Sequence, residues 1–203
     1  DRLVATPSRP RNAIIPGCLV DAIVVAEPQE RNEAYTALTG SFEIPYKEWH
    51  TWNEKINDLS QKQRKNNIPA NIIGKRAAQE LRVDDIVNIG IGIPETVARF
   101  ARKSGMLDMI TLTVESGGIG GFPVSGEAFG AMIGAASVYD MANQFDLYDN
   151  GGLDVCFMGA LEVDKYGNIN AHRGTGAFAG IGGFANITAK TPTVVFCMTF
   201  NAK

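Results

Sequence analysis

Between residues 69 and 114 the sequence alternates helix-like segments with short apolar runs, and this alternation constrains the fold more than any other feature. A helix is predicted to begin near Pro69, because proline is favoured in the first turn of a helix. The run 86–89 is typical of a strand, 95–103 of a helix with basic residues near its C-terminus, and 109–114 of a second strand. A strand, a helix and another strand in this order predict a parallel sheet.

The segments before this region have a different character. The apolar run 18–26 is rich in β-branched residues and predicts a buried strand, which needs partner strands from elsewhere. Residues 31–68 are polar and charged, as is typical of a connection between domains. Their basic cluster of Lys62, Arg64 and Lys65 is interpreted as a solvated surface, with contact to a phosphate as the alternative.

The C-terminal third adds two more predicted strands, at 154–159 and 193–200, and a hairpin turn at 164–168. Four clustered polar residues before the first of these strands are interpreted as a turn, with a substrate role as the alternative: Asn143, Gln144, Asp146 and Asp149.

Composition argues against several classes of function. The 203 residues have a net charge of -3 and no basic face, which argues against binding to nucleic acid. No apolar run reaches the roughly 18 residues needed to span a membrane. Cys18, Cys156 and Cys197 lie in or beside apolar runs and are predicted to be buried, reduced thiols of a cytoplasmic protein. With His50 and His172 as the only histidines and no C-x-x-C pair, no metal site is predicted.

Glu115 is the leading candidate for a reactive group. It ends the apolar run 109–114 and opens the stretch 115–121, which contains four glycines in seven residues. Glycine lets a backbone approach a ligand closely and direct its N–H groups at an anion. The alternative is a glutamate at the end of a strand that caps a following helix.

The second glycine-rich loop, residues 90–94, lies between a predicted strand and a predicted helix and could place N–H groups against an anion. One alternative is a plain tight turn. Another is a dinucleotide-binding fingerprint, with Glu115 about 20 residues further on as the ribose ligand. That reading has a defect, because Glu95 occupies the third glycine position and brings negative charge where pyrophosphate would approach.

Several ordered segments resemble the family I coenzyme A-transferases, and in particular the single-chain short-chain acyl (acetate, propionate, acetoacetate) CoA-transferases. Agreement of several motifs in order is a more specific signal than any one motif alone. The resemblance rests on residues 15–26, 87–94, 115–121, 145–149, 151–154 and 180–184.

This resemblance implies a role for each glycine-rich loop. Glu115 would be the nucleophile that attacks an acyl-CoA thioester. Gly183, or its neighbour Gly182, would donate a backbone N–H to the oxyanion, with a plain glycine-rich turn as the alternative. The loops around four further glycines would line the CoA or acyl side of the site: Gly90, Gly92, Gly117 and Gly118. Coenzyme A is then a substrate, and neither a tightly bound cofactor nor a metal is implied.

The implied fold is α/β, a mainly parallel sheet with helices on both faces, like the NagB/RpiA/CoA-transferase group. Residues 1–30 would end a preceding N-terminal CoA-transferase domain, 31–68 would connect the domains, and 69–203 would form a catalytic domain that is incomplete at its C-terminus. The expected partners are acyl-CoA, a short-chain carboxylate, the missing N-terminal domain and further copies in a homo-oligomer. An acyl-CoA hydrolase on the same scaffold and an inactive fragment remain as alternatives.

Overall fold

The computed structural model describes residues 20–23, 68–124, 130–174, 177–178 and 180–199. Of the predicted connection at 31–68, only Ile68 is among these residues, and it begins a helix. The basic cluster lies outside them, as does Cys18. Residues 20–23 belong to a separate unit, Asp1–Arg31, and everything below concerns the unit Asn32–Lys203. The strand predicted at 18–26 is not formed at 20–23, which are exposed and contain a bend at Asp21. A strand needs a neighbour for its hydrogen bonds, and none of the described strands pairs with this segment.

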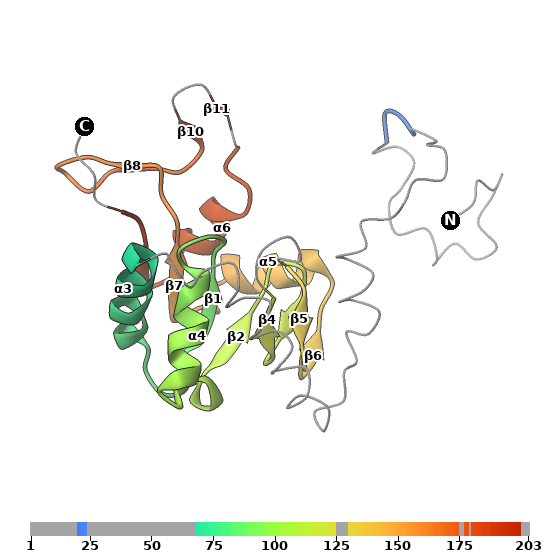
Figure 1. Cartoon of the computed structure of the whole chain (residues 1–203). Helices are drawn as coiled ribbons and strands as arrows, with labels where there is room; N and C mark the ends of the chain where they lie inside the picture. The colour runs from blue at the N-terminus through green and yellow to red at the C-terminus, as the bar shows by residue number, and fades with distance from the viewer. Residues whose placement is uncertain (1–19, 24–67, 125–129, 175–176, 179, 200–203) are drawn as a thin grey trace, which may run out of the picture. The chain divides into compact units, whose positions relative to one another are not determined.

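A six-stranded sheet forms the centre of this unit (Figure 1). Its strand order is β12-β7-β1-β2-β3-β6; the first four strands are parallel and the last two pair antiparallel. The predicted α/β fold with a mainly parallel sheet is therefore confirmed. The strands are β1 (Ile86–Ile89), β2 (Thr111–Thr113), β3 (Gly118–Ile119), β6 (Ser137–Val138), β7 (Val155–Met158) and β12 (Thr193–Phe196).

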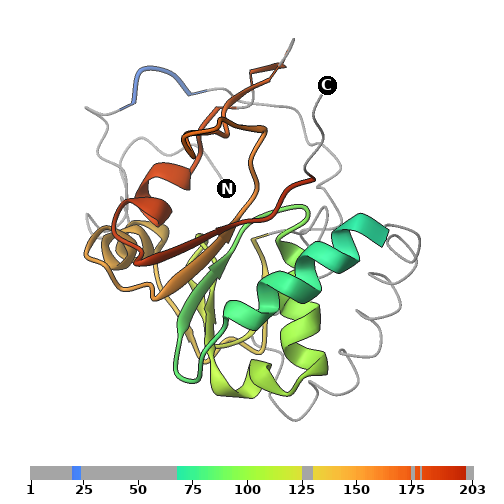
Figure 2. The same cartoon turned by 90° about the vertical axis from the view of Figure 1, so that its left-hand side faces the viewer.

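Helices cover both faces of this sheet, as predicted (Figure 2). Helices α3 (Ile68–Ala77) and α4 (Glu95–Lys103) pack over one face, and α5 (Met141–Asp149) and α6 (Phe184–Ala189) over the other. Alternate residues of each strand supply the two cores, because successive side chains of a strand point to opposite faces. Val87, Ile89, Leu112, Val114, Val155 and Phe157 face α3 and α4, whereas Ile86, Cys156, Met158, Val194 and Phe196 face α5 and α6.

The remaining elements are short. Two 3-10 helices, Ala78–Glu80 and Met106–Met109, extend α3 and precede β2. Three two-stranded sheets are formed by β4 (Phe122–Pro123) with β5 (Met132–Ile133), β8 (Glu162–Val163) with β9 (Ile169–Asn170), and β10 (Arg173–Gly174) with β11 (Ala177–Phe178). The predicted hairpin turn at 164–168 joins β8 to β9, and the Asp164 carboxylate accepts the Asn168 N–H at 2.9 Å.

One segment differs from its prediction. The polar cluster attributed to a turn lies on helix α5 instead. Gln144 and Tyr148 stand one helical turn apart and are fully buried, while Asn143, Asp146 and Asp149 are exposed. An amphipathic helix produces this division, since residues four apart share a face. No described helix has the length and apolar character needed to cross a membrane.

Candidate active site

Glu115 follows β2 at the carboxyl end of the parallel strands, on the side of the sheet that faces α5 and α6. Leu112 and Val114 pack toward α3 and α4, so the alternation of side chains directs Thr113 and Glu115 to the opposite face. In the sheet register Thr113 lies beside Asn88 of β1, which is on that same face. The chain continues from Glu115 through a turn to β3 and not into a helix, so the helix-cap interpretation of Glu115 is wrong.

A cleft of about 390 Å³ brings Glu115 together with loops that are distant in sequence. Because parallel strands end at one edge of a sheet, the segments after β1, β2 and β7 meet there with the loop before α6. Among the described residues that line it, Glu115 has the only charged side chain. They are Gly90, Ile91, Glu115, Met158, Gly159, Ala160, Leu161, Ala171, Ile181, Gly182, Gly183, Phe184 and Ile187.

Gly182 and Gly183 line this cleft. Within residues 68–199 that the structure places, no hydrogen-bond acceptor is found for either N–H. Gly182 has a φ of 53°, a left-handed conformation that favours glycine, and open space where a Cβ would stand. Gly183 has an ordinary φ of -76°, and a Cβ there would lie 2.9 Å from Cζ of Phe145. Backbone geometry thus requires glycine at 182, and the Phe145 ring requires it at 183.

The loop after β1 uses its N–H groups within the protein. The Gly90 N–H donates to the Phe157 carbonyl at 2.8 Å, and the Gly92 N–H donates to the Glu95 carboxylate at 2.7 Å. Glu95 is buried at the start of α4 and fills the position where the pyrophosphate of a dinucleotide would bind. The dinucleotide interpretation is therefore excluded. Gly90 lines the cleft and Gly92 does not.

The glycines that follow Glu115 are required by packing. A Cβ on Gly117 would lie 1.8 Å from the Tyr139 carbonyl oxygen, and one on Gly121 would lie 2.5 Å from the Ile133 carbonyl oxygen. The Gly117 and Gly120 N–H groups donate to carbonyls of Val114 and Leu112. The expectation that this stretch directs its N–H groups at an anion is thus wrong for those two residues. Gly117 and Gly118 do not line the cleft.

Sequence reasoning missed the buried polar group beside Glu115. Asn88 Nδ2 and Gln144 Nε2 donate to the Tyr148 hydroxyl at 3.3 and 2.9 Å, and that hydroxyl donates to Thr113 Oγ1 at 3.0 Å. All four side chains are essentially inaccessible to solvent. The one available signal was Asn88 itself, a polar residue within an apolar strand.

This polar group affects the ionisation of Glu115. Burial raises the pKa of the Glu115 carboxyl, and hydrogen bonds from its own backbone N–H and from the Asn88 side chain oppose that rise only in part. Desolvation disfavours the carboxylate, while hydrogen bonds to the charged form favour it. A carboxylate with a raised pKa is also a better nucleophile than an ordinary one, since nucleophilicity rises with basicity.

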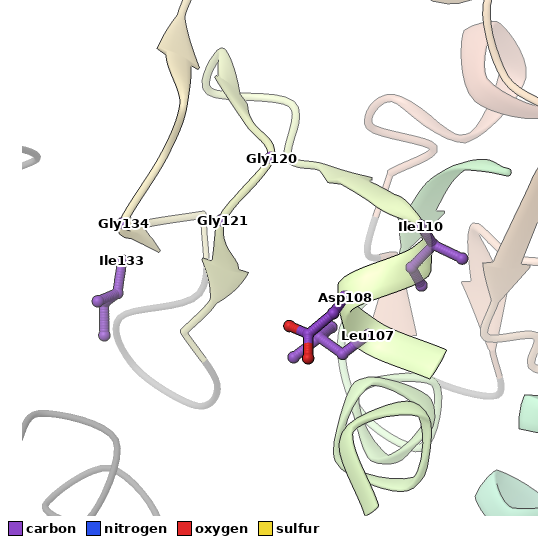
Figure 3. Close-up of a pocket in the computed structure, with 7 residues that line it drawn as sticks. All are labelled: Leu107, Asp108, Ile110, Gly120, Gly121, Ile133 and Gly134. Carbon is purple, nitrogen blue, oxygen red and sulfur yellow. The ribbon is translucent and has the colours of Figure 1, made fainter. Parts of the chain in front are cut away.

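The other candidate groups lie elsewhere. Cys156 and Cys197 are free and buried, as predicted, and burial raises the pKa of their thiols to about 12 and about 11. No three His, Cys, Asp or Glu side chains of the described segments are placed to hold a metal ion. A second cavity, of about 270 Å³, lies at the other end of β2, where Leu107, Asp108 and Ile110 face Gly120, Gly121, Ile133 and Gly134 (Figure 3).

The sequence model of the coenzyme A transferase family matches residues 70–196, which include Glu115 and all three glycine-rich loops. The chain belongs to the coenzyme A transferase family. This assignment confirms the resemblance seen in the ordered motifs.

Named relatives agree with the family assignment. Acetate CoA-transferase YdiF of Escherichia coli (strain K12) is 37% identical over 196 residues, which cover 95% of this chain and 35% of that protein. Caffeate CoA-transferase of Acetobacterium woodii is 38% identical over 208 residues, which cover 96% of this chain and 37% of that protein. The chain thus spans about a third of the length of these two relatives.

A solved structure shares the fold. The acyl-CoA transferase YdiF of Escherichia coli O157:H7, in a thioester complex with CoA, superposes with a TM-score of 0.57 and 37% sequence identity. The superposition covers 63% of this chain and 23% of that one.

Proposed function

We propose that the natural polypeptide carrying this sequence transfers coenzyme A between short-chain carboxylic acids through a thioester on Glu115. One observation carries the proposal: among the described residues, Glu115 has the only charged side chain lining a cleft that is also lined by Gly182 and Gly183, whose backbone N–H groups have no acceptor among those residues. Two relatives are named CoA-transferases, and a third protein of the same fold was solved as a thioester complex with CoA.

A carboxylate nucleophile suits this chemistry because it conserves the energy of the thioester. The Glu115 carboxylate attacks the acyl-CoA carbonyl, the C–S bond breaks, and a mixed anhydride and the CoA thiolate result. The thiolate then attacks the Glu115 carbonyl carbon, which releases the first carboxylate and leaves a glutamyl-CoA thioester. An incoming carboxylate reverses both steps, so the kinetics are ping-pong. Attack by water on either intermediate would lose that energy as heat.

The residues that line this cleft would have different roles in the reaction. Carbonyl oxygens become negative during each attack, and the Gly182 and Gly183 N–H groups supply donors for that charge. The other described side chains that line the cleft are apolar, among them Ile91, Met158 and Phe184. The raised pKa of Glu115 makes it a more basic attacking group. Gly90 contributes close backbone packing, while the ligand contacts predicted for Gly92, Gly117 and Gly118 stay predictions.

The match to relatives about three times as long supports the further proposal that an N-terminal domain of the same enzyme shares the site. Acyl-CoA and a short-chain carboxylate would be its substrates, and homo-oligomers in the cytoplasm its working form. Under this proposal the isolated 203-residue chain has little transferase activity.

The test is to trap the thioester in the full-length polypeptide. Acetyl-CoA is added without an acceptor acid, borohydride reduces the thioester to an alcohol, and peptide mass spectrometry locates the reduced residue. We expect reduction at Glu115 only, and none in Glu115→Ala. Glu115→Asp withdraws the carboxylate by one methylene and should lose about 100-fold in rate, because a shift of about 1 Å can cost that much.

Two results would overturn the proposal. Reduction at another residue would displace Glu115 as the nucleophile. Rapid release of free CoA without any acceptor, at the rate of transfer, would identify a hydrolase instead.

A further inference from the structure

The hydrogen bonds behind Glu115 run in one direction, and a single backbone carbonyl sets that direction. Thr113 Oγ1 lies 3.0 Å from the Val87 carbonyl oxygen, which can only accept, so the Thr113 hydroxyl must donate its one proton to it. Thr113 Oγ1 is then an acceptor for the Tyr148 hydroxyl at 3.0 Å. The Tyr148 hydroxyl hydrogen is therefore used in the bond to Thr113, and the Tyr148 oxygen can only accept hydrogen bonds from its other neighbours.

This polarity determines which way the Asn88 amide faces. The Tyr148 oxygen accepts from Asn88 Nδ2 and from Gln144 Nε2. A flipped Asn88 would set its carbonyl oxygen against an oxygen that has no proton to give. Asn88 therefore holds its NH₂ group on the side of Tyr148, and that group has a second N–H. Asn88 pairs with Thr113 in the sheet register, and Glu115 follows Thr113 by two residues on the same face, so we infer that this second N–H serves the Glu115 carboxylate.

We propose that Tyr148 is a positioning residue for the nucleophile, which acts through Asn88 by holding its amide in the orientation that donates to Glu115. The inference rests on the proposed function of Glu115. Tyr148 is fully buried and does not line the cleft, so it touches no substrate. Its effect on the reaction passes through the amide.

Two buried amide oxygens without hydrogen-bond partners indicate that the polar group of Asn88, Thr113, Gln144 and Tyr148 has a role beyond stability. Asn88 Oδ1 and Gln144 Oε1 are buried and have no hydrogen-bond partner in the described part of the chain. An unsatisfied buried polar group costs a protein stability, and apolar residues of similar shape would avoid that cost. The protein keeps two amides whose oxygens are unpaired but whose N–H groups are used, which fits a site selected for donors.

Few other described groups are placed to affect the ionisation of Glu115. No second charged side chain is found among the lining residues of its cleft that the structure describes. From the packed elements, β1 supplies Asn88, α5 supplies Tyr148, and β7 supplies Cys156, whose thiol stays neutral because burial raises its pKa to about 12. The Asn88 N–H lowers the pKa of Glu115, so its loss should raise that pKa.

The test compares Tyr148→Phe, Thr113→Val and Thr113→Ser in the full-length polypeptide. Tyr148→Phe removes only the hydroxyl. Thr113→Val removes the acceptor that takes the Tyr148 proton, so Tyr148 can turn its O–H toward Asn88 and the amide can flip. Thr113→Ser keeps the hydroxyl and should behave as the parent. In the first two variants we expect kcat to fall about tenfold, the value of one charge-assisted hydrogen bond, with KM for acyl-CoA little changed.

The pH profile separates positioning from mere structural support. The acid limb of kcat/KM reports ionisation of the free enzyme. It should move to higher pH in Tyr148→Phe and Thr113→Val and stay in place in Thr113→Ser. Lower activity with an unmoved acid limb in the first two variants would overturn the inference. If Tyr148→Phe does not fold, the two Thr113 variants decide alone, and identical profiles for them would also overturn it.

Failure of the proposed function would look different. In that case the parent enzyme itself would give no borohydride-reducible adduct at Glu115. If the inference alone is wrong, the parent and all three variants still form the adduct.

Discussion

Adding one methyl group at Gly183 should damage both the fold and the reaction, through the ring of Phe145. A Cβ at this position would stand 2.9 Å from Cζ and 3.0 Å from Cε1 of that ring. Carbon atoms in good contact are about 3.5 to 4.0 Å apart, so either the ring or the loop must move by roughly 0.6 to 1.1 Å. The ring in turn packs edge-on against Tyr148, with their centroids 5.7 Å apart.

The size of the effect follows from this displacement. Overpacking of this kind costs about 1 to 3 kcal/mol in the free energy of unfolding. If the loop moves instead, the Gly183 N–H leaves its place in the cleft, and a shift of about 1 Å can cost about 100-fold in rate. We therefore expect Gly183→Ala to lose about 1 to 2 kcal/mol of stability and about 10- to 100-fold in kcat/KM.

A double-mutant cycle isolates the contact. Phe145→Leu replaces the ring with a smaller side chain, so Gly183→Ala should then cost less free energy of unfolding. Urea denaturation should give a coupling energy of about 1 kcal/mol between the two substitutions. The same pair of variants is assayed for CoA transfer, where the double variant should recover part of the lost rate. Additive losses of stability, within about 0.3 kcal/mol, would refute the steric argument. The bulkier Gly183→Val substitution makes the same clash with Phe145, so it cannot by itself test whether the Gly183 N–H stabilises the oxyanion.

Two more predictions concern ionisation. Burial raises the pKa of Glu115, so the folded state holds its proton to higher pH than the unfolded state, and stability is lost as pH rises through the folded pKa. Glu115→Gln should therefore raise the melting temperature at pH 7 but much less near pH 4, and an equal change at both would contradict the assignment. The Cys156 and Cys197 thiols, with pKa values of about 12 and about 11, should resist alkylation at pH 8 until the protein unfolds. Peptide mass spectrometry measures this, and rapid labelling of the native protein would count against their burial.

The elements that positioned the site could be predicted because their signals are local. The strand at 86–89 and the helix at 95–103 formed as predicted, since each has its own hydrophobic period and its own end signals. The strand that delivers Glu115 is shorter than predicted, because residues 106–109 form a turn of 3-10 helix. Glu115 nevertheless lies where a strand-end residue of a parallel sheet must lie.

What could not be predicted depends on contacts between distant segments. The glycines after Glu115 looked like a ligand loop, but their absent side chains make room for residues 132–139, and no local pattern reveals that approach. Helix α5 was not predicted, because its exposed polar residues have the composition of a turn. Its buried Gln144 and Tyr148 have meaning only opposite Asn88, which is 60 residues from Tyr148 in sequence.

The two faces of the sheet explain why Glu115, the proposed nucleophile, is supported from α5. A carboxylate at the end of β2 must point to one face, and the alternation of side chains sends Glu115 away from the apolar core under α3 and α4. Besides its own backbone N–H, the side-chain donors for it come from neighbours on its own face. In the register of the sheet, the neighbour of Thr113 is Asn88, and the helix above both is α5. A polar residue in β1 and a tyrosine in α5 therefore fit the proposed role of Glu115 as a reactive carboxylate on this face.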